Sequence, residues 1–353
     1  MNSRMRRVYA GLKKENLDGV LVSSPSNITY LTKYQSRDSY LLVSAKKNIY
    51  FTDSRYTQEA KKHLKENAQI VQTNGALLNA ISAACSRLGL KRIAFEEKDL
   101  SYAQYYKISE KLKPFAAFIP FYGIIEKLRQ LKDKEELDKI TKAAQITALA
   151  IKFIQDIIRP GKKEIEIAGE LEHFIRYNGA QYSSFNIIVA SGPNSSYPHH
   201  ITSERRLRNN ELVLIDLGVD FQGYKSDLTR VFFLGKIHPL VKKIYNIVEE
   251  AQKKAIKKIR ESIEISNIDL AARQYITQKG YGAFFSHSLG HGIGLEIHEN
   301  PTISPRQTAK LKQGMVFTIE PGIYLPGKFG IRIEDMVVVT KKGSEVLSGP
   351  INK

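Results

Sequence analysis

One stretch in the C-terminal half constrains the fold most, because it holds two carboxylates that a folded chain can bury in few ways. The short apolar run Leu212–Ile215 is typical of a buried strand, and it ends in Asp216. Asp227 follows after a predicted Gln-Gly turn and precedes a second apolar strand, Val231–Leu234. A hairpin would bring both acids together, where burial and repulsion require hydrogen-bond donors or a cation. Either aspartate taken alone is better explained as a turn or cap residue.

Three further residues complete a set of metal-ligand type. His291 lies in a glycine-rich segment, and Glu320 and Glu334 lie among β-branched and apolar residues rather than in charged surface runs. Two aspartates, one histidine and two glutamates form a hard, oxygen-rich set without cysteine. If some of the carboxylates bridge, this set can hold two divalent ions.

The order and intervals of these motifs resemble those of a known family. The segments LVLIDLGVDFQGYKSDLTR, SLGHGIGLEIHE, VFTIEPGIY and IRIEDMVVV resemble the pita-bread metallopeptidases, in the branch of the Xaa-Pro aminopeptidases and Xaa-Pro dipeptidases. At ordinary residue usage, five prescribed positions coincide by accident on the order of once in 10⁷. The segments SNITYLT, YLLVS and FTDSRY resemble the N-terminal domain of the same branch, which supports the resemblance independently.

The predicted elements divide the chain into two domains. In residues 1–122 helices and strands alternate, which predicts an α/β domain with a mixed sheet, and the resemblance makes this domain creatinase-like. The segment Pro120–Gly123 breaks the pattern, and residues 123–353 then begin with helices predicted over Lys134–Ile158 and Glu164–Tyr177. The resemblance implies an α+β pita-bread catalytic domain here, with two similar halves, helices outside a curved antiparallel sheet, and a site in the cleft between the halves.

The resemblance gives each ligand a role. Asp216 would bind one metal ion through both oxygens, and Asp227 would bridge the two ions. His291 and Glu320 would hold the other ion, with Glu334 as the second bridge. An oxygen-dominated set with one histidine favours Mn²⁺ over a thiophilic ion, and Co²⁺ or Zn²⁺ are the alternatives.

The resemblance also implies catalytic residues around the metals. His199 and His298 would donate hydrogen bonds to the scissile carbonyl region and its developing oxyanion. Glu320 would carry a proton from the attacking water to the leaving nitrogen. The residues around His199 alone predict only exposed loop histidines, and the neighbouring His200, which has no counterpart in the family, is expected to be exposed.

Substrate-contacting residues are implied in the same way. Arg332 matches an arginine that supports the metal ligands and contacts bound molecules, and Phe185 and Tyr324 would line the pocket. One position departs from the pattern, because Thr302 stands where some dipeptidases of the branch carry an arginine near the substrate carboxylate. In this chain Arg306 is the nearby residue that would have to bind the substrate carboxylate in place of that arginine. The departure favours an aminopeptidase over a dipeptidase.

Composition bears on compartment and partners. The formal net charge of +18 is spread along the chain, with lysine pairs in most predicted helices and no interleaved aromatic platform, so we expect no specific nucleic-acid site. The single cysteine, Cys85, is predicted to fill an apolar core and agrees with a reducing compartment. No segment reads as a signal peptide or a membrane span, which predicts a cytoplasmic protein without a membrane partner.

The sequence therefore predicts a dinuclear metal-dependent Xaa-Pro aminopeptidase that acts on peptides with proline at the second position. An Xaa-Pro dipeptidase (prolidase) is the first alternative. A catalytically inactive pita-bread module that binds nucleic acid or protein is the second, because of the basic charge, although the complete ligand set argues against it. Family analogy implies a homodimer.

Overall fold

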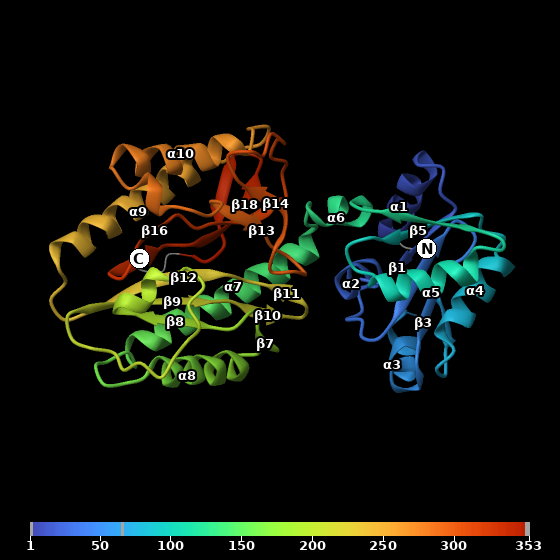
Figure 1. The fold of residues 1–353 in the computed structure, drawn as a ribbon, viewed down its shortest axis with the longest axis horizontal. Helices are drawn as coiled ribbons and strands as arrows, with labels where there is room; N and C mark the ends of the chain where they lie inside the picture. Colours follow the sequence, from blue (N-terminus) through green and yellow to red (C-terminus); the bar gives the residue numbers. More distant parts are fainter. Residues whose placement is uncertain (1–2, 65–66, 350–353) are drawn as a thin grey trace. The chain divides into compact units, whose positions relative to one another are not determined.

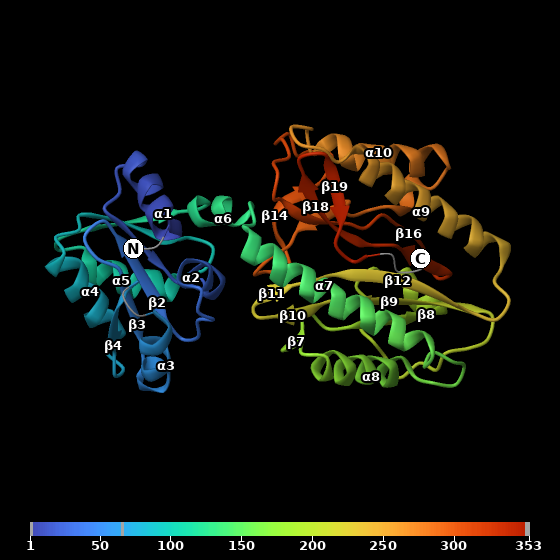
Figure 2. The same cartoon turned by 180° about the vertical axis from the view of Figure 1, so that it is seen from behind.

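The computed structural model describes residues 3–64 and 67–349 and separates into two units, Met1–Arg129 and Gln130–Lys353. Figures 1 and 2 show them from opposite sides. The domain boundary expected after Tyr122 stays a prediction. In the structure helix α6 (Ile124–Arg129) ends the first unit, because Ile125 is buried and the Arg129 Nη1 donates to Asn27 Oδ1 at 2.8 Å.

A six-stranded sheet in the order β4-β3-β2-β1-β5-β6 forms the first unit. Strand β1 pairs parallel with β5 and antiparallel with β2, so the sheet is mixed, as predicted. Helices α4 and α5 cover one of its faces; Cys85 is buried in that core, and burial raises the pKa of its thiol to about 12. The elements are α1 (Ser3–Lys14), β1 (Gly19–Val22), α2 (Pro25–Thr32), β2 (Tyr40–Ser44), β3 (Ile49–Thr52), α3 (Ser54–Leu64), β4 (Gln69–Gln72), α4 (Leu77–Arg87), β5 (Arg92–Glu96), α5 (Tyr102–Leu112) and β6 (Ala117–Phe121).

The second unit has two halves, and in each a pair of helices lies outside the strands (Figure 1). The first half comprises α7 (Lys134–Gln155), α8 (Glu164–Tyr177), β7 (Tyr182–Ser183), β8 (Ile188–Ser191), η1 (Gly192–Ser196), β9 (Glu211–Leu217), β10 (Val219–Phe221), β11 (Tyr224–Lys225) and β12 (Leu228–Leu234). The second comprises α9 (Pro239–Lys258), α10 (Ser266–Gln278), η2 (Gly282–Phe284), β13 (Gly290–Gly292), β14 (Glu299–Ile303), β15 (Val316–Ile319), β16 (Gly322–Leu325), β17 (Phe329–Arg332), β18 (Asp335–Thr340) and β19 (Gly343–Val346).

The helices of this unit lie close to their predicted positions. Helix α8 has the predicted bounds, and α7 begins at Lys134 as predicted but ends at Gln155 rather than Ile158. The Asp133 side chain caps α7 by accepting from the Glu136 backbone N–H at 3.0 Å. No helix in the described residues is long and apolar enough to cross a membrane.

The predicted hairpin around the two aspartates is present. Strand β9 pairs antiparallel with β12, and Asp216 lies opposite Thr229. Between them β10 and β11 form a small hairpin whose turn residues, Gln222 and Gly223, both have positive φ (53° and 87°). Positive φ at both central residues is the requirement of a type I′ turn, so the turn predicted at this Gln-Gly pair is present.

Alternation along β9 explains why Asp216 faces the centre of the unit. Val213 and Ile215 belong to the core beneath α7 and α8, whereas Leu212 and Leu214 belong to the core beneath α9 and α10. Because side chains alternate along a strand, Asp216 shares the face of Leu212 and Leu214. The strand is buried on both faces, which accounts for its continuous apolar run.

A buried ion pair joins the two halves. Arg230 on β12 is 2% exposed, and its guanidinium donates to Asp335 Oδ1 at 2.6 Å and to the Glu334 carbonyl at 2.6 Å. The contact therefore fixes the start of β18 against β12, next to Glu334.

We predict that Arg230→Met lowers the free energy of unfolding of this unit by about 3 kcal/mol or more, because the Asp335 carboxylate stays buried without its cation. The measurement is the urea-unfolding transition. Lys253→Met is the matched control, since Lys253 forms an exposed ion pair with Glu249 on α9 and should leave the transition where it is. Equal, small shifts in both variants would contradict a structural role for the buried pair.

Candidate metal centre

The five predicted metal ligands line one cavity of about 450 Å³ in the second unit. Asp216 lies on β9 and Asp227 directly precedes β12, both in the first half. His291 lies on β13, Glu320 follows β15, and Glu334 lies between β17 and β18, all in the second half. The cavity is therefore built from both halves, with strands at its base.

The substrate-contacting residues predicted from sequence divide into two groups. Phe185, His199, His298 and Arg332 also line the cavity. Tyr324 is buried outside the lining; its hydroxyl accepts from the Arg332 Nη1 at 2.9 Å and lies 3.1 Å from His287 Nε2. Tyr324 thus supports pocket residues rather than forming the pocket surface.

Three of the predicted ligands are close enough to share an ion. One ligand atom each from Asp227, His291 and Glu334 lies within 4.8 Å of the others. The His291 Nε2 is 3.5 Å from Asp227 Oδ2 and 3.5 Å from Glu320 Oε1, so Glu320 lies beside this group of three. The His291 Nδ1 lies 3.1 Å from the Gly292 carbonyl oxygen, so as a donor it would leave Nε2 with its lone pair toward the carboxylates.

Three of the four carboxylates that line the cavity each keep one oxygen without a hydrogen bond. Asp216 Oδ1, Asp227 Oδ1 and Glu334 Oε1 are buried and have no hydrogen-bond partner. The second oxygens of two of them are bound, since Arg332 Nη2 donates to Asp216 Oδ2 at 2.7 Å and Thr229 Oγ1 donates to Glu334 Oε2 at 2.8 Å. An unpaired buried carboxylate oxygen is costly, so three of them around one cavity fit cation ligands.

The electrostatics of the cavity also favours bound cations. Burial, followed by the charges of Asp216 and Glu320, raises the pKa of Asp227 well above its usual range. Burial and the charge of Asp227 likewise raise the pKa of Glu334, and burial raises the pKa of Glu320. These acids cannot all be ionised together without added positive charge, which divalent cations would provide.

Two glycines allow the backbone around His291 to approach neighbouring strands. A Cβ on Gly290 would lie 1.9 Å from the Thr318 carbonyl oxygen, and a Cβ on Gly292 would lie 2.4 Å from the Asn300 carbonyl oxygen. No side chain fits at either position without moving backbone. The glycine-rich segment is thus explained by the close approach of β13 to the strands beside it.

Arg332 organises one wall of the cavity. Besides binding Asp216, its guanidinium donates to the Thr229 hydroxyl at 3.0 Å, the Tyr324 hydroxyl at 2.9 Å and the Pro198 carbonyl at 3.1 Å. These contacts use four of the five N–H groups of an arginine. Arg332 therefore orients a carboxylate and holds the loop that carries His199.

His298 lines the cavity next to His291. Its ring is 4.3 Å from the His291 ring in an edge-on arrangement. Burial, followed by the charges of His291 and His199, lowers the pKa of His298 to about 4. The imidazole is therefore neutral at neutral pH and can present an N–H to a substrate oxygen without adding a charge.

Three polar residues of this region were not predicted. His287 lines the cavity, and burial lowers the pKa of its imidazole to about 4. Thr229 binds both Glu334 and Arg332; its position two residues after Asp227 on the same strand face could have indicated it. His200, expected to be exposed, instead lies 2.9 Å from Glu164 Oε2 with its side chain only 11% exposed. No local pattern in the sequence marks His287 or the partner of His200.

Comparison with known proteins agrees with this geometry. Residues 138–341 match metallopeptidase family M24, and residues 4–131 match the creatinase/prolidase N-terminal domain. The uncharacterized peptidase YqhT of Bacillus subtilis (strain 168) is 36% identical, over 98% of this chain and 96% of its own.

Solved structures resemble the whole chain. The Xaa-Pro dipeptidase from Bacillus anthracis has a TM-score of 0.96 and 39% identity, over 99% of this chain and 98% of its own. The X-Pro aminopeptidase from Thermotoga maritima MSB8 has a TM-score of 0.91 and 36% identity, over 99% of each chain. These likenesses confirm the predicted creatinase-like and pita-bread domains, and the chain belongs to metallopeptidase family M24.

Proposed function

We propose that this chain is a dinuclear metal-dependent peptidase that removes the N-terminal residue from peptides with proline at the second position, an Xaa-Pro aminopeptidase. The observation that carries the proposal is the group of three buried, unpaired carboxylate oxygens beside His291 at the base of the cavity. Such a group is costly in a protein core unless it binds cations. The expected cytoplasmic location and homodimer are part of the same proposal.

The donor set fits two divalent ions. Asp216, Asp227, His291, Glu320 and Glu334 would hold them. When bound, such ions supply a nucleophile at neutral pH and stabilise negative charge on the scissile carbonyl. Four carboxylates and one imidazole favour Mn²⁺, with Co²⁺ or Zn²⁺ as alternatives.

The chain's own residues would handle protons and orientation. Glu320 Oε1 accepts from the Thr318 hydroxyl at 3.2 Å, which fixes the carboxylate at the cavity surface. From that position it would take a proton and deliver it to the leaving nitrogen. His199 and the neutral His298 would donate hydrogen bonds to the substrate carbonyl and its developing oxyanion.

The proline preference rests on relatives and is compatible with the cavity. Phe185, Ile188 and Ile297 give the cavity an apolar wall near the polar base. A proline ring requires such a wall, since it offers no N–H and few polar contacts. The solved relatives named Xaa-Pro dipeptidase and X-Pro aminopeptidase support this specificity.

The cavity lining favours an aminopeptidase over a dipeptidase. A dipeptidase must bind a carboxylate close to the scissile bond, which calls for a positioned cation. Among the described residues, Arg332 is the one lysine or arginine that lines the cavity, and most of its donors are engaged. Thr302 lines the cavity without a charge. The Xaa-Pro dipeptidase remains the second candidate, because the relative from Bacillus anthracis carries that name.

We predict that chelation abolishes Xaa-Pro hydrolysis, that Mn²⁺ restores it, and that active protein binds about two metal ions per chain. Asp227→Asn should lose metal and activity together, because it removes the bridging charge. Asp220→Asn is the matched control, since Asp220 is buried in the adjoining hairpin and pairs with Lys225. Active protein without metal would contradict the proposal.

A second prediction concerns stability and pH in the presence of a chelator. The raised pKa of Asp227 means that the folded, metal-free protein keeps a proton that the unfolded chain releases above about pH 4. Wild-type stability should therefore fall relative to Asp227→Asn as pH rises from about 5 to about 8, and saturating Mn²⁺ should reverse this trend. Melting temperatures of both proteins, with and without Mn²⁺, test this; a constant difference across pH would refute it.

A third prediction separates the two peptidase types. With Mn²⁺ present, an Xaa-Pro-Xaa tripeptide should be cleaved at least as efficiently as an Xaa-Pro dipeptide, because no free cation awaits the dipeptide carboxylate. The comparison is of kcat/KM. A clear preference for the dipeptide would assign the chain as a prolidase, and similar cleavage of an Xaa-Ala control would remove the proline specificity.

A further inference from the structure

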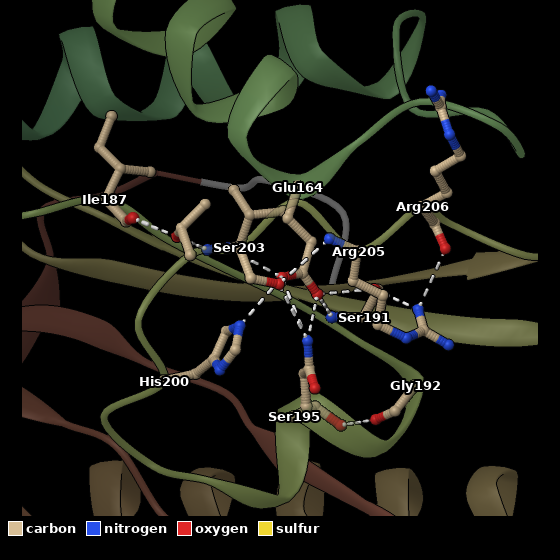
Figure 3. A network of polar contacts seen from close by, with 12 residues as sticks. Glu164, Ile187, Ser191, Gly192, Ser195, His200, Ser203, Arg205 and Arg206 are labelled. Carbon is tan, nitrogen blue, oxygen red and sulfur yellow. Dashed lines mark hydrogen bonds and ion pairs between the residues drawn. The ribbon is translucent and has the colours of Figure 1, made fainter.

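A second buried carboxylate, Glu164, lies outside the candidate metal centre and has no part in the chemistry above. It is the first residue of α8 and is 0% exposed. Figure 3 shows it at the centre of a network of polar contacts that converge from the segment between β8 and β9. A carboxylate with no access to water needs several donors to remain buried, and this one has them.

The donors come from both ends of one loop. At its start, the Ser191 backbone N–H and hydroxyl donate to Glu164 Oε1 at 2.7 and 2.6 Å, and Asn194 Nδ2 donates at 3.0 Å. At its end, the Ser203 backbone N–H and hydroxyl donate to Glu164 Oε2 at 3.1 and 2.6 Å. One side chain thus ties together the two ends of the segment Gly192–Thr202.

The same loop carries His199 to the metal centre. His199 lines the cavity, and the residue after it, His200, lies 2.9 Å from Glu164 Oε2 through its Nε2. The residue before it, Pro198, accepts from Arg332 through its carbonyl. His199 is therefore held between a contact to Arg332 on one side and a contact to Glu164 on the other.

The charge of Glu164 strengthens these contacts. Burial alone would raise the pKa of Glu164. The hydrogen bonds from Ser191, Ser203 and His200 outweigh burial and lower this pKa. Hydrogen bonds to an anion are roughly twice as strong as neutral ones. A glutamine at this position would keep the shape but would replace one accepting oxygen with an amino group that cannot accept from Ser203 or Ser191.

We propose that Glu164 is a positioning residue for His199: by binding Ser191, His200 and Ser203 it fixes the loop that holds the His199 imidazole over the candidate metal centre. The proposal rests on the proposed function for the role of His199. Because small displacements of a substrate-orienting group are costly, losing the contact should slow hydrolysis although Glu164 touches neither substrate nor metal.

The kinetic test places Glu164→Gln in two backgrounds, wild type and His199→Ala, using the full chain with Mn²⁺ and an Xaa-Pro-Xaa tripeptide. We expect kcat/KM to fall about tenfold or more in the wild-type background and by less than about twofold in the His199→Ala background, with metal content unchanged in both. An equal factor in both backgrounds would overturn the proposal, because Glu164 would then act independently of His199.

Glu172→Gln is the matched control. Glu172 lies on the same helix and accepts from the Ser183 hydroxyl at 2.6 Å, but it has no contact with the loop that carries His199 among those described. It should leave kcat/KM unchanged in both backgrounds. If Glu172→Gln reproduces the loss seen with Glu164→Gln, the effect belongs to α8 as a whole and the proposal fails.

Hydrogen exchange gives a readout that does not depend on activity. In Glu164→Gln, amides of residues 192–203 should exchange about tenfold faster or more, while those in the middle of α8 keep their wild-type rates. Unchanged exchange in the loop would overturn the proposal, whether or not the wild type is active. Absence of Xaa-Pro hydrolysis by the wild type would refute only the proposed function. If Glu164→Gln does not fold, Ser203→Ala replaces it, because this variant removes one hydroxyl donor to Glu164. The same faster exchange in the loop is expected, with a smaller factor.

Discussion

Repulsion among buried carboxylates is the constraint on which the second unit depends. Asp216, Asp227 and Glu334 each keep an unpaired oxygen in a cavity whose base is closed by strands, and burial raises the pKa of the latter two. The fold keeps the acids in place by binding the remaining oxygens: Arg332 binds Asp216, and Thr229 binds Glu334. The protein donors stop short of neutralising the group. That shortfall favours a metal centre over a salt-bridge network at this cavity.

The architecture follows from the same requirement. Asp216 lies on a strand that is buried on both faces, and the other three carboxylates directly precede or follow strands. A strand buried on both faces needs a covering layer on each side. The two helix pairs of the second unit supply these layers, and Arg230 with Asp335 joins the halves beside Glu334. Strand alternation then decides which residues reach the centre, because Asp227, Thr229 and Val231 share one face of their strand as Asp216 and Leu214 share one face of theirs.

Sequence reasoning recovered what local patterns and the family motifs encode. The apolar run before Asp216, the Gln-Gly turn and the helix after Lys163 each depend on nearby residues, and all were predicted. It did not find contacts between residues distant in sequence. Glu164 and His200 are 36 positions apart and come together only through the packing of α8 against the loop, so His200 read as an exposed residue. The contact between Arg129 of α6 and Asn27, which are 102 positions apart, is another contact that no local pattern indicates.

The two histidines that we propose to contact substrate share one structural feature. His199 comes from the first half and His298 from the second, and in each case the next residue along the chain forms a largely buried polar contact. His200 binds Glu164, and Glu299 forms an ion pair with Lys132 at 2.6 Å, with side chains 8% and 1% exposed. Neighbouring Cα atoms are only about 3.8 Å apart, so fixing one side chain leaves the adjacent backbone little freedom. A histidine whose ring N–H already donates to a protein acceptor could not offer that N–H to a substrate. Fixing the neighbouring residue instead holds the imidazole in place and leaves its ring nitrogens free for the role that we propose.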